Sequence, residues 1–93
     1  MLEVGSVVWA TAGRDKHRFY AVVRLEDGIA AIADGKRRKL LNPKRKNVLH
    51  LRHTKTVLGS DALKTDKQLR LALAPFNREE GAGMNKKEGT RLV

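Results

Sequence analysis

Short apolar stretches, separated by turn residues, dominate the first half of the chain. In the first stretch Val8 and Ala10 would share one face of a strand, with Val7 and Trp9 on the other face. The same reasoning predicts five strands in all, at residues 6–11, 19–25, 29–33, 39–41 and 48–51. Five short strands with turns every few residues indicate a mainly β fold, either a small closed barrel or a half-open one.

Aspartate-glycine pairs mark two of the turns between these strands. Asp27-Gly28 follows the second expected strand, and Asp34-Gly35 follows the third. Such pairs suit tight hairpins because glycine adopts a positive φ without a steric penalty. We therefore expect Asp34 and Gly35 to have structural roles.

The apolar spacing becomes helical after residue 64. One face of the expected helix collects Leu69, Ala72, Leu73 and Phe76. Thr65 or Asp66 is a candidate N-cap, and Pro75 predicts that regular helix ends near residue 73 or 74. A shorter turn is expected to begin at residue 60 or 61.

The chain has 93 residues, a length that corresponds to one small domain. A domain of this size buries only a modest core. We expect residues 1–58 to form the barrel and residues 59–77 to form a helical segment packed on or beside it. Residues 78–93 show no apolar period, which is typical of a flexible tail.

Cationic residues outnumber acidic ones. The chain has 20 Lys and Arg against 10 Asp and Glu, a formal net charge of +10. Such a charge favours an anionic partner, nucleic acid first and an anionic membrane surface second. No apolar run approaches the roughly 20 residues of a membrane span, and no signal peptide is visible, so we expect a cytoplasmic protein.

The first basic segment is Gly13-Arg14-Asp15-Lys16-His17-Arg18, between the first two expected strands. Gly13 can take a positive φ, which would let Arg14, Lys16 and Arg18 extend from one tight turn as donors to an anion. Asp15 would cap the turn by accepting from a nearby backbone N–H. An ordinary charged hairpin loop explains this segment equally well.

The second basic segment, residues 36–60, contains no acidic residue. Its nine cations are Lys36, Arg37, Arg38, Lys39, Lys44, Arg45, Lys46, Arg52 and Lys55. A solvated face does not require so long an unrelieved run, so we interpret the segment as a site for a polyanion. If both basic loops lie on one rim of the barrel, they form a single patch that follows a phosphate backbone.

Other chemistry finds little support. With no cysteine in the chain, a disulfide framework, a thiolate zinc site and a cysteine nucleophile are excluded. His50 and His53 lack further metal ligands, and Trp9 is expected to pack rather than to stack on a base. Asp34, Asp61 and Asp66 are explained as turn or cap residues. We find no catalytic arrangement and expect neither enzymatic activity nor a cofactor.

Residues 5–23 resemble a KOW motif, which ribosomal proteins and transcription elongation factors share. The matching residues are Gly5-x-Val7-Val8-x-Ala10-x-x-Gly13, the basic loop, and Ala21-Val22-Val23. His17 departs from the motif, because a second loop glycine is usual there.

The resemblance extends over residues 2–77. Residues 2–8 and the Asp34-Gly35 turn are similar to the fourteen-e type large-subunit ribosomal protein of archaea and eukaryotes. Residues 42–51 and 65–73 look like the stand-alone KOW proteins of Gram-positive bacteria. The resemblance implies an SH3-like five-stranded barrel and RNA binding.

These observations together predict an RNA-binding protein that contacts the phosphate backbone, with ribosomal RNA or the ribosome as its target. Ribosomal proteins are further candidate partners, and the free protein is expected to be a monomer without membrane contact. The expected RNA-binding residues are Arg14, Lys16, His17, Arg18, Lys36, Arg37, Arg38, Lys44, Arg45 and Lys46. The expected structural residues are Gly5, Gly13, Asp34 and Gly35.

Two alternatives stay open. One is a protein-interaction module of the transcription or translation machinery, which SH3-like barrels also serve. An aromatic groove would favour it, and the chain has only one Trp, one Tyr and two Phe. The other is a barrel that coats DNA, because charge alone does not distinguish DNA from RNA.

Overall fold

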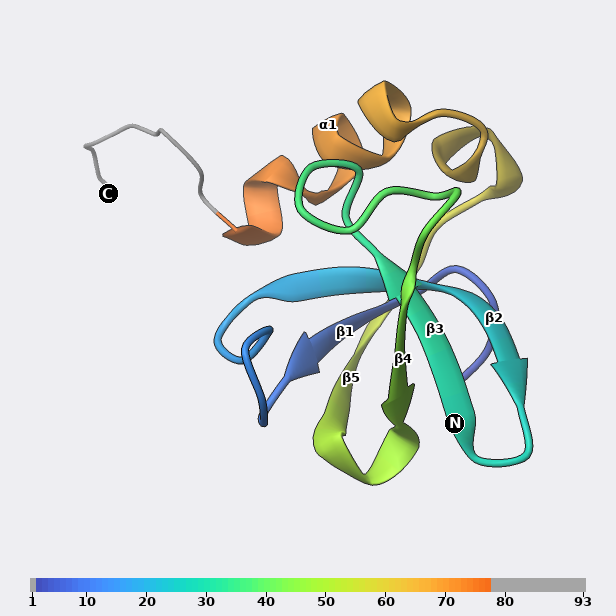
Figure 1. Cartoon of the computed structure of the whole chain (residues 1–93). Helices are drawn as coiled ribbons and strands as arrows, with labels where there is room; N and C mark the ends of the chain where they lie inside the picture. The colour runs from blue at the N-terminus through green and yellow to red at the C-terminus, as the bar shows by residue number, and fades with distance from the viewer. Residues whose placement is uncertain (1, 78–93) are drawn as a thin grey trace.

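A computed structural model describes residues 2–77 of the chain. Five strands form one antiparallel sheet in the order β4-β3-β2-β1-β5, and one α-helix follows (Figure 1). The strands are β1 (Ser6–Ala10), β2 (Phe19–Glu26), β3 (Ile29–Ala33), β4 (Lys44–Asn47) and β5 (Leu51–Val57). The helical elements are η1 (Val48–His50), η2 (Ser60–Leu63) and α1 (Asp66–Asn77). The mainly β class with a C-terminal helix is therefore confirmed.

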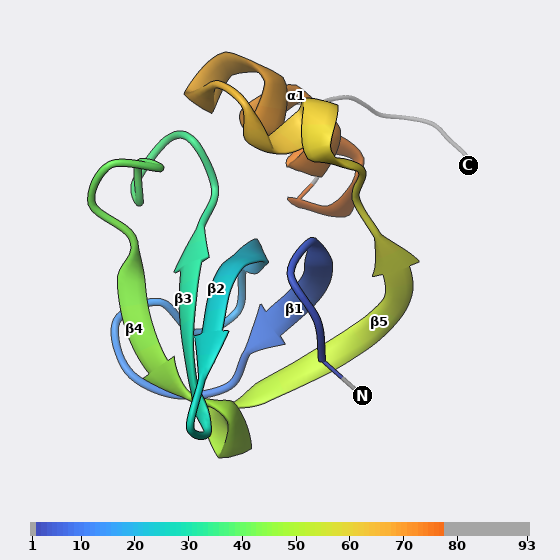
Figure 2. The same cartoon turned by 90° about the vertical axis from the view of Figure 1, so that its right-hand side faces the viewer.

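Apolar side chains cover both faces of the sheet. On one face a buried cluster joins all three central strands and β5, and contains Val8, Ala10, Tyr20, Val22, Ala30, Ile32 and Leu51. On the other face Val7, Ala21 and Ala33 pack against Leu69 and Leu73 of α1. Figures 1 and 2 show the helix above the strands from two sides. The predicted alternation along the first strand is thus correct.

The predicted fourth and fifth strands are wrong. Residues 39–41 belong to the connection between β3 and β4, and Leu41 is 99 % exposed. Residues 48–50 form η1, and the last strand begins only at Leu51. The prediction followed short apolar pairs, whereas β4 (Lys44–Asn47) carries basic and polar side chains and is held by its pairing with β3.

The helix begins as predicted and ends later. Thr65 is the N-cap, because its Oγ1 accepts from the backbone N–H of Gln68 at 3.1 Å. The expected end near residue 73 or 74 is wrong, since α1 includes Pro75 and continues to Asn77. The side chain of Asn77 accepts from the N–H of Phe19 at 2.8 Å and donates to its C=O at 3.1 Å. This pair of bonds holds the last turn on β2 despite the N–H that Pro75 lacks.

The expected shorter turn is present as η2. Asp66 does not serve as the helix cap that the sequence suggested, because its Oδ1 accepts from the N–H of Leu40 at 2.8 Å. It fastens the connection between β3 and β4 to the start of the helix. Within residues 2–77 no helix has both the length and the apolar character to cross a membrane. The predicted tail, 78–93, lies outside the described residues.

Candidate nucleic-acid interface

Two basic loops lie side by side in the fold. The first loop is residues 11–18, between β1 and β2, and the second loop is residues 34–43, between β3 and β4. Trp9 pairs with Phe19 and Ala33 pairs with Ala21, so β1 and β3 both end at the start of β2. The strand pairing therefore brings the two loops to the same end of β2.

Asp15 of the first loop joins the two loops from inside. The residue is 3 % exposed, and its carboxylate accepts from Arg38 Nε at 2.9 Å and from Arg38 Nη2 at 3.2 Å. Lys46 Nζ lies 3.4 Å from Asp15 Oδ2 and also donates to the C=O of Ala12 at 2.9 Å. The hydroxyl of Tyr20 donates to the same carboxylate at 3.3 Å. Asp15 is thus a buried counter-ion, and its predicted role as a turn cap is wrong.

Burial and the surrounding charges shift the pKa values of Asp15 and Tyr20. Burial raises the pKa of Asp15, but the hydrogen bond and charge of Arg38 and the charge of Lys46 outweigh burial and hold this pKa below its usual value. Burial, followed by the charges of Asp15 and Asp34, raises the pKa of Tyr20 to about 12. Asp15 therefore carries its charge, and Tyr20 its proton, at neutral pH.

Asp34, which belongs to the second loop, also joins the two loops. Its Oδ1 accepts from the backbone N–H groups of Lys36, Arg37 and Arg38, each at 2.9 Å. Its Oδ2 lies 3.4 Å from Nη2 of Arg18 in the first loop. Asp34 thereby shapes the second loop and also anchors the first, which is more than the turn role that its Asp-Gly pair indicates.

Gly35 and Gly5 are positions where the chain packs too closely for a side chain. Gly35 has a φ of +79°, and a Cβ there would meet the backbone C=O of Asp66 and, at 3.0 Å, the N–H of Arg70. The first turn of α1 therefore rests directly on Gly35. Gly5, with a φ of +98°, approaches the C=O of Leu58 in the same way.

Gly13 has the predicted positive φ, at +78°. A Cβ there would lie 2.7 Å from Lys46 Nζ, so the glycine leaves room for the ammonium group beside Ala12. His17 also has a positive φ, at 70°, and its N–H donates to the C=O of Ala10 at 2.9 Å. The histidine thus adopts the conformation that glycine favours, at the position where a KOW motif usually has its second glycine.

Together, residues 11–18 and 34–43 form one unit, which we call the two-loop junction. Its outward side carries exposed cations. Arg14, Lys16 and Arg37 are exposed, and none of them forms an ion pair with an acidic residue among residues 2–77. Lys36 is exposed beside them on the second loop. The predicted residues therefore divide into anchored cations, Arg18, Arg38 and Lys46, and exposed cations, Arg14, Lys16, Lys36 and Arg37.

Arg45 does not belong to this group. Lys46 pairs with Ala30 in the core and directs its ammonium group to Asp15, whereas Arg45 pairs with Ala31. Neighbouring residues of a strand point to opposite faces, so Arg45 lies on the other side of β4. Lys44 is exposed at the start of the same strand.

Trp9 packs against neighbouring rings, as its sequence context predicts. Its ring centroid lies 4.8 Å from that of Phe19 and 5.9 Å from that of His17. Phe19 continues the contact to Phe76 of α1 at 5.6 Å. This aromatic row connects the first loop to the helix, and it places exposed His17 beside Trp9.

Sequence reasoning does not find the buried role of Asp15 or its hydrogen bond with Tyr20. The signal that could have found it is the position of Asp15 between two cations, which is typical of a shared counter-ion. No group of three or more potential metal ligands occurs within residues 2–77.

No protein-family model matches the chain. A search of curated proteins likewise finds no match.

Proposed function

We propose that this chain is an RNA-binding protein of the KOW class, working in the cytoplasm, that contacts the phosphate backbone of ribosomal RNA. In this proposal the curled antiparallel sheet is an SH3-like barrel, and the two-loop junction is its RNA-binding rim. The anchored cations hold the rim together, and the exposed cations contact phosphates.

The observation that carries the proposal is that two buried aspartates form ion pairs between the two loops. Asp15 of the first loop pairs with Arg38 of the second loop. Asp34 of the second loop pairs with Arg18 of the first loop. Two loops that are far apart in the chain therefore form one surface whose outward residues are cationic. A polyanion that spans both loops gains several contacts at once, and each contact releases counter-ions from the nucleic acid.

Ribosome association is the most direct test. The full-length protein should sediment with purified ribosomal subunits at low salt and dissociate at high salt. A Lys16→Ala/Arg37→Ala variant should bind less than wild type. The control is Lys55→Ala/Lys67→Ala, which removes the same charge from exposed positions on β5 and α1.

Equal sedimentation of the two variants would show that net charge, and not the junction, drives association. Failure of wild type to sediment with either subunit at low salt would contradict the ribosomal target. Binding of the wild-type protein to duplex DNA as tightly as to RNA would favour the DNA-coating alternative.

A further inference from the structure

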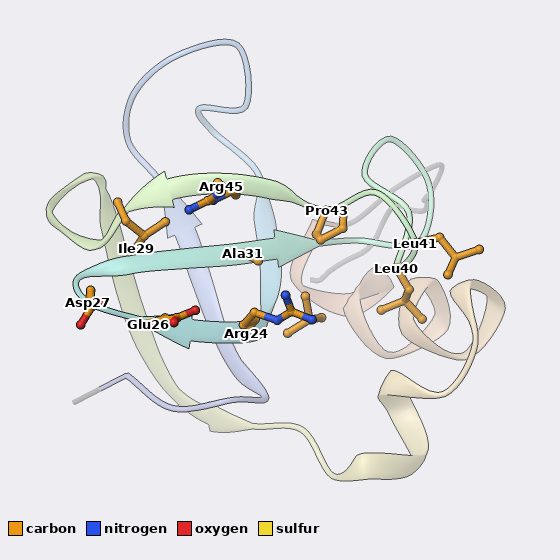
Figure 3. Close-up of a pocket in the computed structure, with 10 residues that line it drawn as sticks. Arg24, Glu26, Asp27, Ile29, Ala31, Leu40, Leu41, Pro43 and Arg45 are labelled. Atoms are coloured by element: carbon orange, nitrogen blue, oxygen red, sulfur yellow. The ribbon is translucent and has the colours of Figure 1, made fainter.

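A second surface feature is a groove of about 710 Å³ on β2, β3 and β4, which shares the end of the second loop with the two-loop junction. The sheet face that α1 covers at Ala33 continues along β3 to Ala31 and Ile29, and both line the groove. The groove is thus the part of that face that the helix does not cover (Figure 3). Its size is within the range of ligand-binding pockets.

Two arginines stand on either side of the groove floor. Arg24 pairs with Ala31, and Ala31 pairs with Arg45, so the three residues form one row across three strands. Ala31, which lies between them, is 8 % exposed and has only a methyl side chain. Neither arginine forms an ion pair with an acidic residue in the part of the chain that the structure describes. A pair of guanidinium groups across an alanine suits one carboxylate or phosphate.

The two ends of the groove differ in chemistry. Leu40, Leu41 and Pro43 gather at one end, and Leu41 is 99 % exposed. Glu26 and Asp27 stand at the other end, where β2 turns into β3. The order along the groove is therefore apolar, cationic and then acidic.

This order favours a peptide over a nucleic acid. An RNA strand that follows the groove would carry its phosphates past Glu26 and Asp27, which repel them. The lining contains no aromatic side chain on which a base could stack. An extended peptide can present a different side chain at each step, and so can match an apolar, a cationic and an acidic site in turn.

We propose that the groove binds an extended segment of a partner protein with three features in order: an apolar side chain, a carboxylate and a basic side chain. The apolar side chain contacts Leu40, Leu41 and Pro43. The carboxylate lies between Arg24 and Arg45. The basic side chain meets Glu26 and Asp27. The charged residues of the groove lie on β2, β4 and the turn after β2, and the exposed cations of the two-loop junction are not among its lining residues.

The test is a selection from a displayed library of random peptides on the immobilised full-length protein. Wild type should enrich peptides that combine an apolar residue, an acid and a base in a fixed order. Synthetic peptides from that selection should bind Arg24→Glu/Arg45→Glu at least roughly tenfold more weakly, since each arginine contributes a charge-assisted hydrogen bond. A matched reversal outside the groove, Lys55→Glu/Lys67→Glu, should bind them as wild type does.

Circular dichroism melting shows whether each variant folds. If Arg24→Glu/Arg45→Glu does not fold, Arg24→Gln/Arg45→Gln is used in its place in the same binding assay. No enrichment on wild type, or equal enrichment on the groove variant, overturns the proposal.

The same two variants are also titrated with an RNA oligonucleotide. Loss of RNA affinity in the groove variant alone would assign the groove to RNA and would likewise overturn the peptide proposal. Failure of the RNA proposal instead appears in the Lys16→Ala/Arg37→Ala variant, which leaves the groove intact.

Discussion

The inner and outer sides of the two-loop junction contain the same types of residue in opposite situations. Inside, Arg38 and Lys46 reach the buried carboxylate of Asp15, and the Lys46 side chain is only 10 % exposed. Outside, Lys16 and Arg37 are exposed and have no described acidic partner. A cation therefore stabilises the fold on one side and is available to a partner on the other.

The largest effect should come from removing the inner counter-ion. Asp15→Ala leaves Arg38 and Lys46 facing each other without a carboxylate. We expect a loss of about 3 kcal/mol in the free energy of unfolding, at the lower end for a broken buried pair because the Arg38 side chain is 30 % exposed. Urea unfolding measures this change.

The control for Asp15→Ala is Asp61→Ala. Asp61 pairs with Lys64 at 3.2 Å, but the two side chains are 92 % and 71 % exposed. An exposed pair of this kind contributes at most about 1 kcal/mol. Equal losses in the two variants would mean that burial of Asp15 does not distinguish the inner side from an ordinary surface.

The next largest effect concerns the support under the second loop. Gly35 and Gly28 have nearly the same φ, +79° and +78°, but a Cβ on Gly28 would meet nothing within 4 Å. Gly28→Ala should cost about 1 kcal/mol for its backbone conformation alone. Gly35→Ala should cost about 1–2 kcal/mol more, because its Cβ pushes against the backbone of α1. Thermal unfolding of both variants gives the difference, and equal melting temperatures would remove the steric role of the helix contact.

A smaller effect is the dependence of stability on pH. The pKa of Asp15 is lower in the folded protein than in the unfolded chain, so its contribution is present above about pH 4, the unfolded value, and is lost as the pH falls through the folded pKa. The stability difference between wild type and Asp15→Asn should therefore shrink in acid. Chemical unfolding at a series of pH values measures it. A difference that stays constant from neutral pH into acid would show that the charge of Asp15 contributes nothing.

The sequence predicted the elements of the fold better than their limits. Alternation in β1 placed Val7 and Val8 on opposite faces correctly, because successive side chains of a strand point to opposite sides, and each residue is buried in a different cluster. The position of β4 was missed because Arg45 and Lys46 give no apolar signal, and their pairing with β3 decides the strand. The length of α1 was missed because Asn77 fixes its end through a contact with Phe19, 58 residues earlier in the chain.

The candidate site was predicted as a set of basic residues but not as a structure. Charge counting found both loops and could not separate Lys16 from Lys46, since the separation depends on where Asp15 is buried. The sequence also placed Arg45 with the loop cations. Strand alternation turns this residue to the other face, where it lies in one row with Ala31 and Arg24 across three strands.

The salt dependence of RNA binding shows whether the exposed cations of the two-loop junction contact phosphates. The logarithm of the binding constant is measured against the logarithm of salt concentration for wild type, Lys16→Ala/Arg37→Ala and Lys55→Ala/Lys67→Ala. We expect the loop variant to lower the magnitude of the slope by roughly 0.7 to 0.9 for each lost contact, while the control keeps the wild-type slope. Both variants should keep the wild-type melting temperature, since neither pair includes an anchored cation. The same slope in all three proteins would show that Lys16 and Arg37 do not contact the phosphate backbone.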